Sequence, residues 1–382
     1  MKKFWPFSFY FLYFAAASSL FPFFVIFYQE LGYSGTQIGL LTGIPPLITI
    51  IAAPFGTGLA DSTKRHKLVM GIGLFVGISM IVMLPFLRIF GLVFTAVILH
   101  NIFMSPIGSL GDSATLTMLG EERTMYGRIR LGGTLGWGLF APIAGFLVQH
   151  QGLKIAFWSF SIIMAVNLFV SQKFDFGAPA ENTSSNGGIK TLLSNRTWIF
   201  FLLTAFLGGL GAFSTASYLY PYMAELGAVE SQMGFASLIA TMTELPIFFF
   251  GHRLIRRFKS HNLFITAIIL MGIRALLFSV ASTPSMVYLV QALGGTMFPL
   301  LWLAGVNYAD ENAPAGLKST AQGLFSAMSF GFGSAVGGFV GGILLANIGG
   351  RSMFFVFGIA ILVLIVLIET IRRLTVGHAV PQ

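Results

Sequence analysis

Apolar runs of about 20 residues recur along almost the whole chain and are separated by short polar breaks. A helical run of this length spans the hydrocarbon core of a bilayer. Of the 382 residues, 55% are hydrophobic and only 9% are charged, and the mean hydropathy is +0.84. One aqueous core in a soluble domain of this size cannot bury so much apolar surface. The sequence therefore predicts an all-α polytopic membrane protein with lipid as its solvent.

The number of runs predicts roughly twelve transmembrane helices, at about 32 residues for each span with its loop. The expected helices cover residues 5–28, 37–60, 68–88, 91–116, 129–149, 153–171, 197–222, 232–252, 262–281, 284–309, 319–346 and 350–371.

Basic residues gather in alternate breaks, and this bias predicts the orientation of the chain. The opposite breaks hold only Lys154 and Arg351, with Arg88 near a helix end. The positive-inside rule therefore places both termini in the cytoplasm of a multi-pass inner-membrane protein. The basic breaks hold Lys2, Lys3, Lys64, Arg65, Lys67, Arg123, Arg128, Lys173, Lys190, Arg196, Arg253, Arg256, Arg257, Lys259, Lys318, Arg372 and Arg373.

A short pattern occurs twice, 195 positions apart. The segment Glu30-Leu31-Gly32 with Gln37 and Gly39 recurs as Glu225-Leu226-Gly227 with Gln232 and Gly234, and His66 recurs as His261. Six predicted helices separate the copies, so the repeat preserves direction and indicates two halves related by an axis along the membrane normal. The predicted division is a six-helix bundle over 1–171, a Gly-, Asn- and Ser-containing cytoplasmic linker over 172–196, and a second six-helix bundle over 197–382.

Composition also excludes several classes of protein. The net charge of +9 comes from basic residues spread over the breaks, whereas a nucleic-acid-binding domain gathers them on one face. The chain has no cysteine, and its six histidines show no metal-ligand spacing. No catalytic cluster is visible, so we expect no enzyme activity, no metal and no cofactor.

The loop after the second predicted helix carries a recognisable motif. Gly56-Thr57-Gly58-Leu59-Ala60-Asp61-Ser62-Thr63-Lys64-Arg65 resembles the signature loop of the major facilitator superfamily, and the resemblance extends over the whole chain. It implies the major facilitator fold of two six-helix bundles. Gly56 would permit close helix contact, and Asp61 at a helix end would pair with cations or with a facing helix N-terminus. We therefore expect Gly56, Asp61, Lys64 and Arg65 to form a latch of the outward-facing state.

Ionisable residues at membrane depth mark functional sites by default. Asp112 and Arg130 are centred on the polar turn around residue 121, which places them at matching depth in an antiparallel helix pair. The segment Tyr126–Gly133 resembles the Tyr/Phe-Gly-Arg-x-Arg motif of lactose permease and phenylpropionate permease relatives. That resemblance implies that Asp112 and Arg130 hold the substrate; a structural ion pair is the alternative. Trp137, two turns beyond Arg130, would stack on a ring, although a lipid-facing role is equally compatible with the sequence.

A second acid and arginine, Glu244 and Arg274, are centred on Lys259 and are also expected at matching depth. Burial favours a protonated carboxyl group and a nearby arginine favours a charged one, so such a pair can load and release a proton. The resemblance to lactose permease departs at the tenth helix, where Gly294 and Met297 stand in place of its His and Glu. Asp112 and Glu244 are then the main acids expected to couple proton movement.

Four further residues are expected to line the cavity as substrate contacts. Trp302 and Asn307 lie on the tenth predicted helix, and His100 and Asn101 lie on the fourth. For His100 and Asn101, hydrogen bonding between helices is the alternative interpretation.

These features together favour proton-coupled symport of a small polar organic solute by alternating access, powered by the proton gradient. Sugars, nucleosides and aromatic acids are the candidate solutes, and the expected functional unit is a monomer. The alternative is proton-coupled efflux, because Ala141–Gly145 partly resembles the Gly-Pro-x-x-Gly-Gly motif of antiporters.

Overall fold

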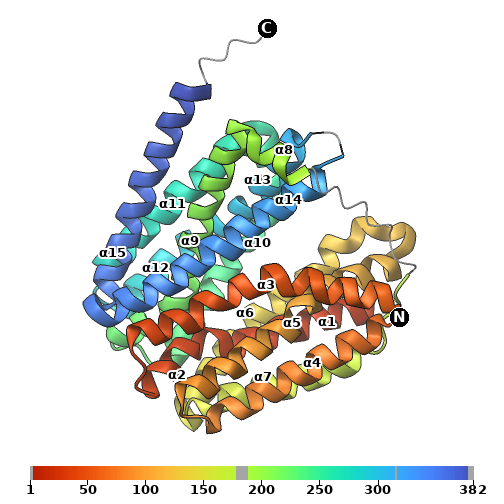
Figure 1. Cartoon of the computed structure of the whole chain (residues 1–382). Helices are drawn as coiled ribbons and strands as arrows, with labels where there is room; N and C mark the ends of the chain where they lie inside the picture. Colours follow the sequence, from red (N-terminus) through yellow and green to blue (C-terminus); the bar gives the residue numbers. More distant parts are fainter. Residues whose placement is uncertain (1–2, 178–187, 315, 377–382) are drawn as a thin grey trace.

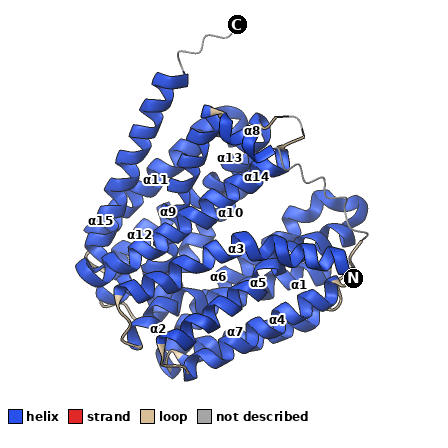
Figure 2. Ribbon diagram, in the orientation of Figure 1, coloured by secondary structure: helices blue, strands red, loops and turns tan. Residues whose placement is uncertain are grey.

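The computed structural model describes residues 3–177, 188–314 and 316–376, and all regular structure within these ranges is helical (Figures 1 and 2). Long apolar runs without a β-alternating pattern, in a chain with lipid as solvent, must satisfy their backbone hydrogen bonds internally, which a helix does. The elements of the first part of the chain are α1 (Phe4–Leu20), η1 (Phe21–Phe23), α2 (Phe24–Glu30), α3 (Gly35–Thr63), α4 (His66–Met83), η2 (Leu84–Phe86), α5 (Phe90–Leu119), η3 (Gly120–Met125), α6 (Tyr126–Gln151) and α7 (Lys154–Ser171). Those that follow are α8 (Gly188–Ser194), α9 (Arg196–Glu225), α10 (Glu230–Phe258), α11 (Ser260–Val280), α12 (Pro284–Gly294), α13 (Met297–Asn312), α14 (Lys318–Ser326), η4 (Ala327–Gly333) and α15 (Ser334–Val376).

Ten helical stretches of the described chain are long and apolar enough to cross a membrane. Two of them, Phe90–Gln151 with 62 residues and Lys318–Thr375 with 58, are each far longer than one crossing requires. Each also contains a break in the backbone, at η3 after Gly120 (φ 53°) in the first and at Gly349 (φ 77°) in the second. The expected twelve crossings, and the side of the membrane on which the termini lie, stay predictions.

Helices α1–α7 form one group, here called the first half, and α9–α15 form the second half (Figure 1). The two halves lie side by side at one end of the molecule, the closed end, and diverge toward the end where the N-terminus lies, the open end (Figure 1). The division at 171 and 197 stays a prediction, and residues 178–187 of the expected linker lie outside the described residues.

Glycines bring the two halves together at the closed end. On α3, a methyl group at Gly39 would lie 2.5 Å from the Phe339 carbonyl oxygen of α15. On α10, a methyl group at Gly234 would meet the Ala141 carbonyl of α6. Small residues permit such backbone contact between membrane helices. The closed end is therefore formed by α3 against α15 and by α6 against α10.

The 195-residue repeat corresponds to the same local structure in both halves. Gly32 and Gly227 have φ angles of 75° and 79°, and Lys64 and Lys259 have φ angles of 55° and 64°. The side chain of Gln37 caps the N-terminus of α3 by accepting a hydrogen bond from the Ser34 amide at 2.9 Å, and Gln232 does the same for the Val229 amide at 3.1 Å. Positive φ angles end one helix sharply and the Gln side chain starts the next, so the repeated residues are those that shape the turns.

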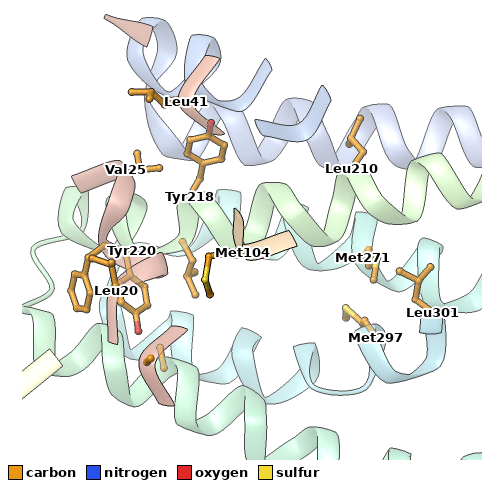
Figure 3. Close-up of a cluster of buried hydrophobic side chains, with 14 of the residues drawn as sticks. Leu20, Val25, Leu41, Met104, Leu210, Tyr218, Tyr220, Met271, Met297 and Leu301 are labelled. Atoms are coloured by element: carbon orange, nitrogen blue, oxygen red, sulfur yellow. The ribbon is translucent and has the colours of Figure 1, made fainter. Parts of the chain in front are cut away.

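Three predicted helices are interrupted. The helix expected over 5–28 contains η1, with Pro22 in its first turn. The helix expected over 284–309 breaks between α12 and α13, at Gly295 and Thr296. The helix expected over 319–346 contains the π-helical segment η4, and π segments often occur at functional sites. Buried side chains around these interruptions, among them Leu20, Tyr220, Met297 and Leu301, contribute to one hydrophobic core cluster (Figure 3).

Candidate functional site

Asp112 and Arg130 form an ion pair in the first half. An Arg130 guanidinium nitrogen lies 3.5 Å from Asp112 Oδ1, and the same oxygen accepts a hydrogen bond of 2.5 Å from the Tyr10 hydroxyl. The side chains of Arg130, Asp112 and Tyr10 come from α6, α5 and α1, respectively. The side chains of Asp112 and Arg130 are 38% and 45% exposed, so the pair retains oxygen and nitrogen atoms that a solute can reach.

Aromatic rings of α1 hold the Arg130 guanidinium. Its central carbon lies 5.1 Å from the centre of the Tyr10 ring and 5.7 Å from that of Phe14, within the range of cation–π attraction. The close approach of α1 and α6 depends on Gly133, where a methyl group would lie 2.6 Å from the Phe14 ring. Tyr10 and Phe14 were not predicted, because nothing in the aromatic-rich run of α1 distinguishes them from packing residues.

Arg130 lies on the side of α6 that is directed toward the second half. Residues seven and eleven positions further along a helix return to nearly the same face. Trp137 and Ala141 are these residues, and the Ala141 carbonyl meets Gly234 of α10. Trp137 is partly buried, and it precedes Gly138, which packs against Thr241 of the second half. Arg130 and Trp137 therefore lie at increasing depth from the open end, toward the point where the halves meet.

In the second half, Arg274 binds an amide side chain that was not predicted from the sequence. Its guanidinium donates a hydrogen bond to Gln291 Oε1, and the Gln291 amide in turn donates to the Ala236 carbonyl of α10 at 3.1 Å. The charges of Glu244 and Arg274 interact, but among the described residues no ion pair within 4.0 Å joins them. Among the described residues, the Gln291 amide is the hydrogen-bond partner of the Arg274 guanidinium, and the matching depth of Glu244 and Arg274 stays a prediction.

Gln291 was not predicted either, since a single amide on a predicted helix carries no signal of its own. Arg274 Nε is buried and has no hydrogen-bond partner in the described part of the chain. Its ring neighbour is Phe278, whose centre lies 5.2 Å from the guanidinium carbon. The second half therefore contains a buried cation with unused hydrogen-bonding capacity.

The remaining predicted contact residues lie in different environments. Trp302 is 38% exposed and meets the Phe330 ring edge-on at 5.4 Å. Asn307 and Asn101 are partly buried, and each donates a hydrogen bond of 2.8 Å to a carbonyl one turn earlier on its own helix.

His100 is only 4% exposed, and its Nδ1 lies 3.0 Å from the Gly77 carbonyl of α4. The rings of Phe21 and Phe160 pack around it at 6.3 and 5.9 Å. This is the hydrogen bonding between helices that the sequence left open as the alternative.

The predicted latch residues lie at the open end of α3. Asp61 Oδ1 is 2.7 Å from His66 Nε2, and the His66 ring stacks on Phe176. Lys64 and Arg65 are exposed, and Gly56 packs against Pro106 of α5. These contacts all lie within the first half. His66 was not predicted as a contact of Asp61, although the sequence repeat had marked it.

Within the described ranges no cluster of three or more His, Asp and Glu side chains is suited to hold a metal ion.

Comparison with known proteins gives three similar transporters. Maltose permease of Geobacillus stearothermophilus is 29% identical over 97% of this chain and 95% of its own length. The multidrug resistance protein MdtG of Escherichia fergusonii is 26% identical over 91% of this chain and 88% of its own length. The crystal structure of a mutant of the nucleoside transporter NupG superimposes with a TM-score of 0.83 at 19% identity, covering 97% of this chain and 99% of that one.

A family model, the MFS_1 like family, matches residues 5–357. The match covers most of the chain and includes the Asp112–Arg130 pair, Arg274 and the Asp61 loop. The chain therefore belongs to the MFS_1 like family and is a multi-pass membrane transporter of the major facilitator superfamily.

Proposed function

We propose that this protein is a proton-coupled symporter that imports a small hydroxylated solute, a sugar or a nucleoside, across the inner membrane. The observation that carries the proposal is the half-exposed pair of Asp112 and Arg130 with the Tyr10 hydroxyl bound to it. The maltose permease and nucleoside transporter relatives support the choice of solutes. An aromatic acid is the less favoured third class, since Asp112 would repel its carboxylate.

The pair suits hydroxyl groups for a chemical reason. A carboxylate accepts hydrogen bonds from two neighbouring hydroxyls, while the planar guanidinium donates to their oxygens. Because the Asp112–Arg130 contact is 3.5 Å long and both side chains are accessible, solute hydroxyls can bind both groups from the exposed side while the two charges stay paired.

Transport would proceed by rocking of the two six-helix halves around this region. The proposal includes twelve crossings, with the long stretches divided at η3 and Gly349, and both termini in the cytoplasm. Lys64, Arg65 and Lys318 lie at the open end, so the positive-inside rule supports a cytoplasmic opening. In this proposal the structure represents the inward-facing state of a monomer.

Proton coupling is assigned to Glu244 and Arg274. In the arrangement described here, Arg274 binds Gln291 and leaves Glu244 without a direct cationic partner. A protonated Glu244 fits that arrangement, and an ionised Glu244 would draw Arg274 away from the amide. Exchange of Arg274 between Gln291 and Glu244 would then link the proton to the position of α11 against α10. Asp112 is the second acid in this scheme, coupled to solute binding.

The binding proposal is tested in proteoliposomes with radiolabelled maltose and uridine. Asp112→Asn and Arg130→Lys should each weaken binding at least tenfold, since the first removes the carboxylate charge and the second removes the planar fork of donors. Asp310→Asn is the matched control, because Asp310 pairs with Lys318 at the open end at 2.8 Å. Affinity equal to the parent in both site variants would reduce the pair to a structural role.

The coupling proposal uses the same vesicles and a pH electrode. Symport into the vesicles alkalinises the external medium when the solute is added, and Glu244→Gln should abolish this signal while solute exchange continues. Exchange and proton movement both unchanged in Glu244→Gln would contradict its assignment.

Proton-coupled efflux is the second candidate, favoured by the MdtG relative and by the Ala141–Gly145 segment on α6. The segment packs against α10, with a methyl group at Gly145 meeting the Glu230 carbonyl. An antiporter would acidify the external medium when solute enters, which is the opposite sign in the same measurement.

A further inference from the structure

Three aromatic side chains gather on the second half beside the helix interruptions. Phe298 and Trp302 are one turn apart on α13, and Phe330 belongs to the π segment η4. The Phe330 ring meets Trp302 edge-on at 5.4 Å and meets Phe298 at 6.2 Å. Phe298 and Trp302 are each 38% exposed, so part of each ring surface is accessible in addition to the contacts with Phe330.

The exposed face of α13 lies between α10 and the π segment η4. The opposite face is buried, since Leu300 and Ala304 on that side are only 8% and 1% exposed. On the adjoining side, Leu301 packs against Gly208 of α9. On one flank Leu303 packs against Gly251 of α10, and on the other flank lies Phe330 of η4.

Both flanking elements touch the first half. Thr241 of α10 packs against Gly138 of α6, and Gly331 of η4 packs against Ile50 of α3. Trp302 therefore lies on α13 between two elements that each contact the first half. It is ten residues from the end of α13, and Phe330 is twelve residues from the start of α14, which places both roughly 15–18 Å from the open end.

Trp137 of the first half lies at a similar depth, eleven residues from the start of α6 or roughly 16 Å. The Asp112–Arg130 pair lies nearer the open end on the same half. A solute that enters from the open end would thus meet the charged pair first and the aromatic side chains after it.

We infer that Phe298, Trp302 and Phe330 form an aromatic platform that stacks on the flat apolar face of a cyclic solute. This inference rests on the function proposed above and narrows its solute class to rings with hydroxyl groups on the rim. The platform carries no charge of its own, and edge-on contacts fix the orientation of the Trp302 indole before binding. Pyranose sugars and nucleosides both have such a face, whereas open-chain polyols do not.

The test separates stacking from simple apolar lining. Trp302→Leu keeps an apolar side chain without a flat face, and Trp302→Phe keeps a smaller flat face. Binding of maltose and of uridine should fall about tenfold in Trp302→Leu and less than about threefold in Trp302→Phe. The matched control is Trp158→Leu, since Trp158 on α7 is also partly buried but contacts Phe86 within the first half.

Four outcomes are decisive. Loss with Leu and retention with Phe supports the platform, and the solute that shows the larger loss identifies the ring that it binds. Equal affinity in the parent and Trp302→Leu, measured where the parent binds a solute, overturns the platform and leaves the proposed function intact. Tighter or equal binding of sorbitol, an open-chain polyol, overturns the ring requirement. A parent protein that binds neither maltose nor uridine overturns the proposed solute class, and the platform with it.

Discussion

At the closed end the halves meet through backbone and small side chains, whereas at the open end charged side chains pair within one half. Gly39, Gly43 and Gly338 bring α3 and α15 into backbone contact at the closed end. At the open end, Lys3 pairs with Glu122 and Asp61 with His66. Contacts without charges can separate without leaving unpaired ions in lipid, and charged groups at an aqueous end can change partners at little cost. An uncharged contact at one end and exchangeable ion pairs at the other would allow the two ends to open in turn.

One hydrogen-bonded group joins the halves within the apolar closed end. The Thr42 hydroxyl of α3 lies 2.9 Å from the Tyr218 hydroxyl of α9, and both bind the Gly338 carbonyl of α15. Tyr218 is fully buried (Figure 3). The closed end therefore combines close packing of glycines and apolar side chains with one small group of hydrogen bonds.

The largest expected effect comes from filling the glycine contact. Gly39→Val places its side chain on the Phe339 carbonyl, so the closed end cannot form and transport should fall more than about tenfold. The chain has no cysteine, so a single Ala335→Cys, buried in the closed end, reports its opening by maleimide labelling. Labelling should rise strongly in Gly39→Val.

The control for Gly39→Val is Gly58→Val on the same helix, where a methyl group would meet nothing within 4 Å. Transport and labelling should match the parent in this control. Parent-like labelling in Gly39→Val itself would show that backbone contact does not determine closure.

An intermediate effect is expected from Tyr218→Phe. The change removes the hydrogen bond of the Tyr218 hydroxyl with Thr42 of the first half, together with its bond to Gly338 within the second half, and keeps the ring. Labelling at Ala335→Cys should therefore rise about fivefold. Tyr220→Phe is matched, because the Tyr220 hydroxyl lies 3.0 Å from Ser237 within the second half, and it should label like the parent. Equal rises in both variants would indicate lost stability without a specific effect on closure.

The smallest effect is expected from Asp61→Asn at the open end. Asp61 contacts only its own half here, but as a latch it would stabilise the opposite state, so its loss should lower Ala335→Cys labelling by about threefold. The direction is opposite to that of Tyr218→Phe. Raised labelling would exclude the latch. The additional variant His66→Gln removes the local partner of Asp61 and shows how much of the effect comes from the Asp61–His66 contact.

The sites show how far local pattern can be followed. The positions of Asp112 and Arg130 follow from counting residues about a turn, and the two side chains do meet at 3.5 Å. The same count predicts matching depth for Glu244 and Arg274, and it does not predict the Gln291 amide from a third helix that binds the arginine. Counting residues on either side of a loop gives the depth of two side chains along their helices. It cannot show which side chains a third helix places beside them.

The sequence by itself determined the membrane environment, the helical class, the resemblance to major facilitators and the repeat with its turn residues, because each of these depends on hydropathy or on backbone geometry within a few positions. Only the tertiary structure decided which end is closed, which side chains surround Arg130 and Arg274, and which aromatic side chains gather beside the helix interruptions. Those features depend on how α3, α6, α10 and α15 pack against one another, and packing between distant segments leaves no periodic pattern along the chain. The glycine contacts at Gly39 and Gly234 are the link between the two levels, since the repeat marks the residues and the structure supplies their partners.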